Sequence, residues 1–274
     1  MKIFIKLAFV FTLLVSVFLV PNSGYAAAQK NSQTSSVDLD YIKNKAYYKK
    51  LEIEKDKQME KEEKAFQAKQ KKKIKTLSKS NEYYTIPVTY KKQKYFNYCG
   101  VAAGVQALSF HKKQSGSSEE LPSQDHFGIT IGTLPKKKGT SSTYLANGLN
   151  KYKYVYKFSK NPYIVGDIAQ YSKPAVKLEN RIKSTLRQKK TAPIILLDTK
   201  WLKRYKGKSY RHYVTVSGYN KNADQLRLVD PNHHTKYTGG KPYWEKLGTT
   251  KSKYGVAVAV YAADVASPNP VMVW

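Results

Sequence analysis

Cysteine is almost absent from this sequence: Cys99 is the single one among 274 residues. One cysteine cannot form a disulfide within the chain, so a fold held together by internal disulfides is excluded. The thiol is then either a small buried side chain that packs like a hydrophobe or a group kept for its reactivity. Composition alone leaves both readings open.

Acidic residues are also scarce, since 19 Asp and Glu stand against 49 Lys and Arg and give a formal net charge of +30. Lysine dominates the basic residues, which indicates a diffuse positive field over the surface. No recognisable nucleic-acid module is present, so a specific nucleic-acid partner is not expected. For an exported bacterial protein, anionic cell-wall polymers or lipid headgroups are the polyanions that such a field attracts, in a salt-dependent way.

The start of the chain carries an apolar run that is too short to span a bilayer. Lys2 and Lys6 precede a run from Leu7 to Val20, whereas a membrane span needs roughly 20 apolar residues. Ala26 to Ala28 supplies the small residues that signal peptidase prefers. We interpret residues 1–28 as a cleaved signal peptide, with an uncleaved membrane anchor as the alternative. The mature protein is expected to be secreted, in part associated with the cell wall, without a stable membrane span.

Glycine and proline are missing from residues 40–80, where Lys, Glu, Asp and Gln dominate. High helix propensity and acid–lysine pairs four residues apart, such as Glu60 with Lys64, predict a solvated helix. The apolar positions do not sustain a heptad pattern, so a coiled coil is not predicted. We interpret residues 29–80 as a charged, helical segment that serves as a spacer, a tether or a removable pro-segment.

From residue 81 onward the sequence becomes rich in tyrosine and in strand patterns. Helices are predicted first and strands mainly afterwards, which is the order of an α+β domain rather than of alternating βαβ units. The predicted helices are 99–110, 141–150 (capped by Thr140 or Ser141) and 177–190, and the predicted extended segments are 83–90, 192–197, 213–219, 225–229 and 255–261.

Cys99 lies at the predicted start of a buried helix, where a thiol has a physical reason to be reactive. The helix dipole and the unpaired amides of the first turn favour the thiolate. Gly100 removes side-chain bulk next to the thiol and leaves a backbone N–H accessible. Gln93 lies six residues earlier, and its side-chain amide would supply a second oxyanion donor if the loop folds back.

His212 is the best candidate for a general base, because it begins a predicted strand that can hold its ring rigidly. Asp230 ends the next predicted strand, and an antiparallel pairing through the turn at 220–224 would bring it close to His212. A carboxylate there fixes the imidazole tautomer and supports its positive charge. The pair His233 and His234 has no further ligands at a recognised spacing, so no metal or other cofactor is expected. The other two histidines are His111 and His126.

Together these motifs give the chain a family resemblance over roughly residues 85 to 262. It resembles the bacteriocin-processing, double-glycine-leader type of cysteine peptidase, in a stand-alone secreted form, within the papain-like superfamily. The matching pieces are Gln93, Asn97-Tyr98-Cys99-Gly100, Gly132-Thr133, Gly139-Thr140-Ser141, Leu149-Asn150, the strand at Pro193, His212-Tyr213-Val214 and Asp230-Pro231-Asn232.

The resemblance implies a papain-like α+β fold over residues 81–274, with N-terminal helices packed on a mainly antiparallel sheet. It also implies Cys99 as the nucleophile and His212 as the general base and acid, oriented by Asp230. Gln93 and the backbone amide of Cys99 would form the oxyanion hole. Members that trim double-glycine leaders are typically fused to a membrane exporter, and this chain shows neither transmembrane spans nor a phosphate-binding loop, so leader cleavage is not expected.

The sequence therefore predicts a secreted cysteine peptidase or amidase that cleaves a peptide or amide bond through a thioester on Cys99. Two alternatives remain open at this point. An acyltransferase would use the same thioester and differ only in whether an amine or water receives the acyl group. A catalytically idle wall-binding or surface-binding protein would keep the fold and use its basic charge for adhesion.

Overall fold

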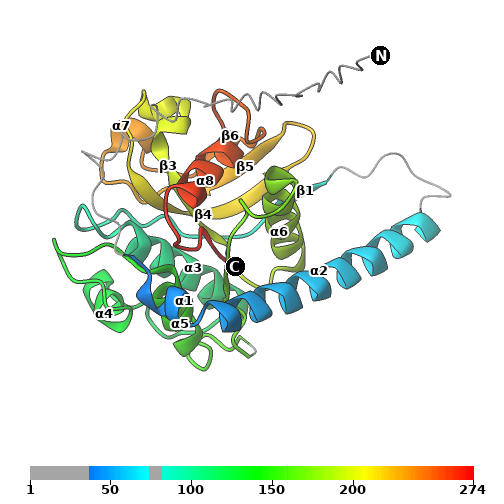
Figure 1. Ribbon diagram of the computed structural model, residues 1–274. Helices are drawn as coiled ribbons and strands as arrows, with labels where there is room; N and C mark the ends of the chain where they lie inside the picture. Colours follow the sequence, from blue (N-terminus) through cyan, green and yellow to red (C-terminus); the bar gives the residue numbers. More distant parts are fainter. Residues whose placement is uncertain (1–36, 74–81, 159) are drawn as a thin grey trace, which may run out of the picture. The chain divides into compact units, whose positions relative to one another are not determined.

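The computed structural model describes residues 37–73, 82–158 and 160–274 (Figure 1). The segment interpreted as a signal peptide, residues 1–28, lies outside the described residues. In the described ranges, no helix is both long and apolar enough to cross a membrane.

The core of the molecule is a seven-stranded sheet in which every pair of neighbouring strands is antiparallel. Its order is β2-β7-β3-β4-β5-β6, and β1 also pairs with β4. The central strand β3 reads Ile-Ile-Leu-Leu and is buried on both faces, as a continuous apolar run of strand length predicts. The strands are β1 Tyr83–Thr85, β2 Val165–Gly166, β3 Ile194–Asp198, β4 Arg211–Asn220, β5 Gln225–Val229, β6 Tyr243–Lys246 and β7 Met272–Val273.

Helices precede most of the sheet in the sequence, and the predicted α+β class is confirmed. The helices predicted from Cys99, Ser141 and Lys177 are present, and the Ser141 side chain caps its helix by accepting a hydrogen bond from the N–H of Tyr144. The helices after the first described segment are α3 Cys99–Ser115, α4 Gln124–Thr130, α5 Ser142–Lys151, α6 Pro174–Gln188, α7 Thr235–Thr238 and α8 Val256–Val265, with short 3-10 turns η3 Thr199–Trp201 and η4 Lys203–Tyr205.

The strand predicted at 255–261 is wrong, because this segment forms helix α8. Its alternating Val and Ala residues resemble a strand, but five successive residues from Val256 to Val260 are buried on all sides. A helix that is hydrophobic all round is typical of a protein interior, where periodicity does not distinguish it from a strand. Its small alanines allow α8 to pack closely against β3 and α6.

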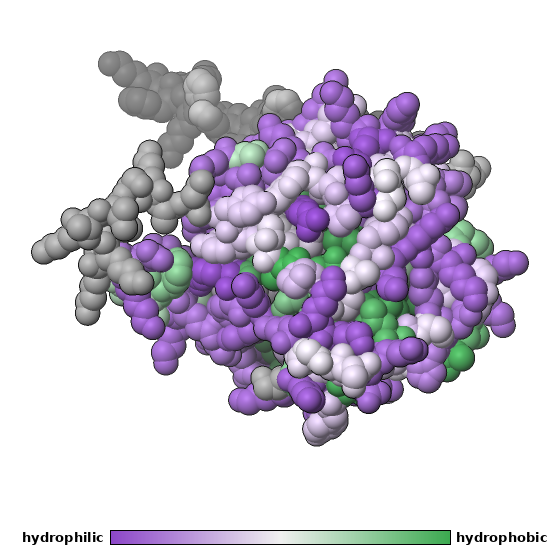
Figure 2. Space-filling model, turned by 180° about the vertical axis from the view of Figure 1, so that it is seen from behind, coloured by the Kyte–Doolittle hydropathy of each residue, from purple (hydrophilic) through white to green (hydrophobic). Residues whose placement is uncertain are grey.

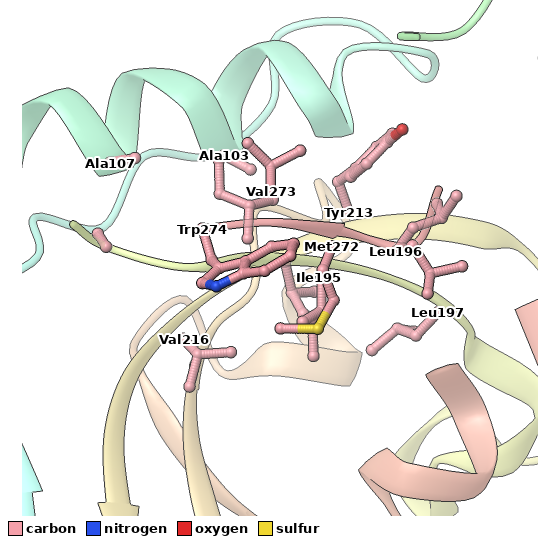
Figure 3. Close-up of a cluster of buried hydrophobic side chains, with 14 of the residues drawn as sticks. Ala103, Ala107, Ile195, Leu196, Leu197, Tyr213, Val216, Met272, Val273 and Trp274 are labelled. Carbon is pink, nitrogen blue, oxygen red and sulfur yellow. The ribbon is translucent and has the colours of Figure 1, made fainter. Parts of the chain in front are cut away.

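Helix α3 packs tightly against the sheet, and Figure 3 shows Ala103 and Ala107 of this helix facing the hydrophobic side chains around Trp274. The residues from Gly100 to His111 are all buried. Glycine is required where neighbours come closest, since a Cβ on Gly104 would lie 2.2 Å from the ring of Phe127. The result is a rigid helix whose first residue has a fixed position relative to β4.

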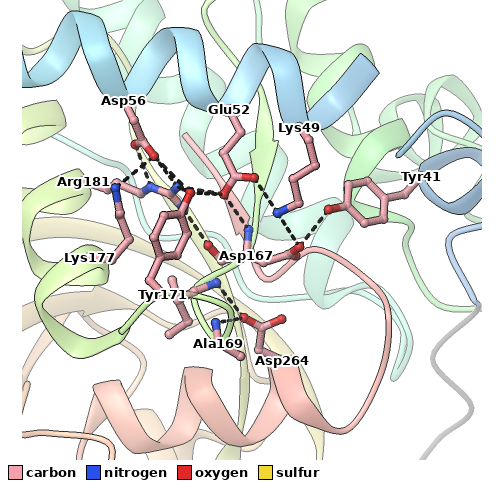
Figure 4. A network of polar contacts seen from close by, with 11 residues as sticks. Tyr41, Lys49, Glu52, Asp56, Asp167, Ala169, Tyr171, Lys177, Arg181 and Asp264 are labelled. Carbon is pink, nitrogen blue, oxygen red and sulfur yellow. Dashed lines mark hydrogen bonds and ion pairs between the residues drawn. The ribbon is translucent and has the colours of Figure 1, made fainter. Parts of the chain in front are cut away.

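The charged segment before the sheet forms helices α1, Leu39–Lys43, and α2, Lys45–Lys73. The expectation that this helical segment is solvated is wrong for one face of α2, because Glu52 and Asp56 are buried against Arg181 of α6 (Figure 4). The guanidinium of Arg181 donates to both carboxylates at distances between 2.6 and 2.9 Å. Buried charges persist only when they are paired, so these contacts fix α2 to the domain.

The outer surface reflects the composition of the chain. Figure 2 shows a face on which hydrophilic residues predominate, with hydrophobic residues visible in a recess near the centre of the view.

Candidate active site

Cys99 is the first residue of α3, so its thiol lies at the N-terminal end of a 17-residue helix. The residue Cys99 is partly exposed, in contrast to the eleven residues that follow it as far as Phe110, which are buried. The backbone N–H groups of Gly100 and Tyr213 donate hydrogen bonds to the sulfur. Donors of this kind, at the positive end of the helix dipole, favour a thiolate.

His212 and Asp230 are brought together by the β4–β5 pairing that the sequence predicts. Thr215 of β4 pairs with Val229 of β5, so the residue after Val229 lies beside the first residues of β4. The Nε2 atom of His212 lies 2.7 Å from Oδ1 of Asp230. Both side chains are buried, His212 with 4% and Asp230 with 0% of its surface exposed.

The imidazole of His212 also forms a hydrogen bond with the Cys99 side chain. Because Asp230 occupies Nε2, the remaining ring nitrogen, Nδ1, is the one available to the sulfur. The three residues predicted as nucleophile, base and orienting carboxylate therefore form one hydrogen-bonded chain in the order Cys99, His212, Asp230.

The pKa values of these three groups shift in the directions that favour a thiolate–imidazolium pair. Burial alone would raise the pKa of Cys99, but the hydrogen bond and charge of His212 bring it below its usual value. Burial likewise opposes the charged form of His212, but the carboxylate of Asp230 and the sulfur raise the pKa of this imidazole to about 10. Burial would also raise the pKa of Asp230, yet the imidazolium and its other donors lower it.

Asp230 accepts more hydrogen bonds than the sequence suggested. The hydroxyls of Tyr205 and Tyr243 donate to Oδ2 at 2.7 and 2.8 Å, and the N–H of Asn232 donates to Oδ1 at 2.9 Å. The carboxylate is thus held in one orientation and kept ionised by fixed donors. Neither tyrosine could be identified from the sequence, because the chain has 23 tyrosines and these two lie on separate elements.

Gln93 is placed close to the end of β5, since its N–H donates to the carbonyl of Pro231 at 2.7 Å. Its side-chain NH2 donates to the carbonyls of Tyr95 and Phe96, both at 2.9 Å. The amide oxygen is buried and has no hydrogen-bond partner. In this conformation the side chain of Gln93 therefore has both amide hydrogens engaged, and an oxyanion donor would require its amide to turn.

The other histidines have different surroundings. His111 is buried in α3, hydrogen-bonded to the hydroxyl of Tyr163 at 2.8 Å, and burial lowers its pKa to about 4. The rings of His233 and His234 contact each other with centroids 3.8 Å apart. In the part of the chain that the structure describes, no three His, Cys, Asp or Glu side chains gather in a way that would bind a metal ion.

A pocket of about 280 Å³ opens beside the thiol. Cys99 lines it together with Arg211 and Tyr213 of β4 and with the loop that contains Lys136 and Lys137. His212 lies between the two lining residues of β4, and neighbouring residues of a strand point to opposite faces. The strand therefore presents the imidazole on one face and the pocket residues on the other.

Comparison with known proteins supports a cysteine peptidase family for this chain, and it does not test the double-glycine-leader type or the secreted form. The Peptidase_C39 like family matches residues 85–254, which is more than half of the chain and includes Cys99, His212 and Asp230. No curated protein sequence matches the chain. Among solved structures, the crystal structure of UfSP from C. elegans is similar with a TM-score of 0.36 and 12% identity over 58% of this chain and 28% of that chain. The extent of the family match shows that the chain belongs to the Peptidase_C39 like family.

Proposed function

We propose that this protein is a secreted cysteine peptidase or amidase that cleaves a peptide or amide bond through a thioester on Cys99. The observation that supports this most directly is the hydrogen-bonded chain from Cys99 through His212 to Asp230 at the N-terminus of α3. Membership in the Peptidase_C39 like family supports a cysteine peptidase as the class of enzyme and a peptide or protein as the substrate.

In the proposed mechanism the Cys99 thiolate attacks the carbonyl carbon of the scissile bond. The proton on Nδ1 of His212 then passes to the leaving amine, while Asp230 accepts the hydrogen bond from Nε2 and supports the ring's orientation. The acyl group remains on the sulfur as a thioester. A water molecule gives a proton to His212 and attacks the thioester carbonyl, and the sulfur leaves as the thiolate, which releases the acid and restores the thiolate–imidazolium pair.

The oxyanion that forms in each step needs hydrogen-bond donors. The N–H of Cys99 is in the first turn of α3, where backbone amides have no acceptor within the helix. We propose this N–H as the first donor. The side-chain amide of Gln93 is the proposed second donor, and it would act after leaving the carbonyls of Tyr95 and Phe96.

The location and the partners are part of the same proposal. The apolar run and the small residues before residue 28 support secretion, and the net charge of +30 supports retention on anionic cell-wall polymer. No specific nucleic-acid partner is proposed. Retention by charge is expected to fade as salt rises, which a binding assay on purified wall material measures directly.

Labelling with iodoacetamide tests the proposed nucleophile. We expect rapid alkylation of Cys99 in the natural protein and none in Cys99→Ser, because the chain has no other thiol. His212→Gln should slow the reaction at least roughly tenfold at neutral pH, since the thiolate loses its cationic partner. Equal rates in the natural protein and in His212→Gln would refute a paired nucleophile and leave the idle binding protein as the better reading.

A second assay separates hydrolysis from acyl transfer. Peptides are incubated with the enzyme, with and without an added primary amine, and the products are identified by mass spectrometry. A hydrolase gives free acid in both cases, whereas an acyltransferase gives the amine adduct.

A further inference from the structure

The pocket beside Cys99 has an unusual balance of charge. Three of the eleven described residues that line it are basic, namely Lys136, Lys137 and Arg211. None of these eleven residues is Asp or Glu. The two lysines are exposed, as are many lysines on this protein, so they do not distinguish the pocket by themselves. The pocket is distinguished instead by Arg211, whose guanidinium has nitrogens without hydrogen-bond partners.

Arg211 has a guanidinium that lacks partners for two of its nitrogens. Its Nη1 donates to the carbonyl of Ala263 at 2.7 Å. The Nε and Nη2 atoms are buried, and neither has a hydrogen-bond partner among the described residues. A buried donor without an acceptor is costly, and a charged one more so.

A second arginine, Arg181, is fully buried and shows how a structural guanidinium is paired in this protein. Arg181 uses Nε, Nη1 and Nη2, with carboxylate acceptors on both Glu52 and Asp56. Arg211 has no such carboxylate. The same chain therefore pairs the guanidinium of Arg181 completely, whereas Arg211, next to the proposed base, keeps two buried N–H groups that have no partner among the described residues.

The acidic groups nearest to Arg211 are engaged elsewhere. Asp198 accepts hydrogen bonds from the N–H of Lys200 and the hydroxyl of Ser209. Asp264 accepts from the N–H groups of Ile168 and Ala169. Both act on Arg211 through their charge, but burial outweighs them and lowers the pKa of its guanidinium. A further carboxylate, which the described part of the chain does not supply, would stabilise the charged guanidinium of Arg211.

The loop with the two lysines is fixed in place by Asn97, two residues before the thiol. Its side-chain NH2 donates to the carbonyls of Leu134 and Lys138 at 2.8 and 2.9 Å, and its Oδ1 accepts from the N–H of Lys136 at 3.1 Å. Both sides of the pocket, the loop and β4, thus present positive charge in positions that are set by the fold.

We propose that this pocket binds a carboxylate of the substrate and that Arg211 determines this specificity. The bound carboxylate would accept from Nε and Nη2 once the guanidinium turns toward the pocket, and Lys136 and Lys137 would attract it to the opening. Since Nε and Nη2 are already out of contact with water in the free protein, binding removes water mainly from the carboxylate. The inference rests on the proposed function, because the pocket selects the substrate that Cys99 attacks.

A pair of alkylating reagents tests this without a known substrate. Iodoacetate and iodoacetamide carry the same reactive carbon, but only iodoacetate carries a carboxylate. The measured quantity is the rate of labelling of Cys99 by iodoacetate divided by the rate with iodoacetamide. This ratio is normalised to the same ratio for a short cysteine peptide and reports recognition of the carboxylate. Both are measured in about 0.3 M salt, which screens the diffuse positive field of the protein. A change in thiolate content affects both reagents equally and leaves the ratio unchanged.

We expect the natural protein to react faster with iodoacetate, so that the normalised ratio is above one. In Arg211→Gln this ratio should be roughly tenfold lower, because a charge-assisted hydrogen bond to the carboxylate is lost. Arg211→Lys should keep part of it. Lys57→Gln, on the exposed side of α2, removes one charge outside the pocket and should leave the ratio within about twofold. If Cys99 of the natural protein is labelled fast but Arg211→Gln leaves the ratio unchanged, the inference about the carboxylate is overturned and the proposed function is not. If both reagents label Cys99 of the natural protein slowly, the proposed function itself is contradicted.

Protection of the natural protein needs no variant and identifies the source of the carboxylate. N-acetylglutamine offers an α-carboxylate, the α-amide of N-acetylglutamate offers a side-chain carboxylate, and N-acetylglutaminamide offers none. We expect one of the two acids to slow labelling of Cys99 by iodoacetamide and the diamide to have no effect. Equal protection by all three, or by none, contradicts the inference.

Discussion

Replacing Asp230 by Asn removes the charge that faces His212 while keeping the shape of the side chain. The amide oxygen can continue to accept from His212 Nε2 and from the N–H of Asn232, as Oδ1 does now. Its NH2 then faces the hydroxyls of Tyr205 and Tyr243, which can rotate and accept. The variant is therefore expected to fold, and the change in the site is mainly electrostatic.

The size of the effect follows from the separation of the two groups. At the 2.7 Å between Nε2 and Oδ1, Coulomb's law with an effective dielectric constant of about 20 gives about 6 kcal/mol for two unit charges. Dehydration of both groups offsets part of this, and breaking a buried pair costs about 3 kcal/mol at the lower end of its range. One pKa unit corresponds to about 1.4 kcal/mol, so the pKa of His212 should fall by roughly two units.

The assay is the rate of iodoacetamide labelling of Cys99 as a function of pH. In the natural protein the thiolate–imidazolium pair exists from the lowered pKa of Cys99 up to the raised pKa of His212, about 10. In Asp230→Asn the imidazolium is less stable, so the thiolate forms only at higher pH, and the rise of the labelling rate with pH should move upward by up to roughly two units. Asp125→Asn, which removes a partly exposed carboxylate that is paired with Lys94, is the matched control. A profile for Asp230→Asn that coincides with the control would refute the assigned role of Asp230.

Three other substitutions test the surroundings of the site. Tyr243→Phe removes one of the donors to Asp230 and should lower the free energy of unfolding by about 1 kcal/mol in urea titrations; an unchanged midpoint would argue against that hydrogen bond. Arg181→Met takes the guanidinium away from two buried carboxylates of α2, which keep only the ion pairs with Lys49 and Lys177. This should cost about 3 kcal/mol and expose α2 to limited proteolysis, and equal protease resistance would contradict it. Gly100→Ala places a Cβ 2.5 Å from the side chain of Thr140, so the free energy of unfolding should fall by about 1–3 kcal/mol in urea titrations. Adding Thr140→Gly should restore part of this stability. An unchanged free energy of unfolding would mean that α3 can shift.

The features that the sequence predicted are those set by short stretches of chain. The helix from Cys99 follows from the spacing of its apolar residues, and the closeness of His212 and Asp230 follows from two strands joined by a short turn. In both cases the residues that matter are near each other in the sequence, so local patterns were sufficient.

The features that it missed depend on contacts between distant segments. Tyr205 and Tyr243 reach Asp230 from a 3-10 turn and from β6, and no local pattern separates them from the other tyrosines. Arg181 is 125 residues from its partner Asp56, so the helix that contains Asp56 looked solvated. Helix α8 was misread because burial on all sides, which decides between helix and strand for such a segment, is a property of the assembled fold.

The two faces of strand β4 carry different parts of the proposed site, and this arrangement affects how the substrate specificity of such an enzyme can change among relatives. Positions 211 and 213 line the pocket, while position 212 carries the imidazole. Substitutions at positions 211 and 213 are therefore expected to change the substrates that the proposed pocket accepts without disturbing His212, the proposed proton-transfer residue. Insertion or deletion of one residue in this stretch would exchange the two faces of the strand and should abolish both proposed roles at once. Relatives should consequently vary in composition at 211 and 213 but keep the length of this strand.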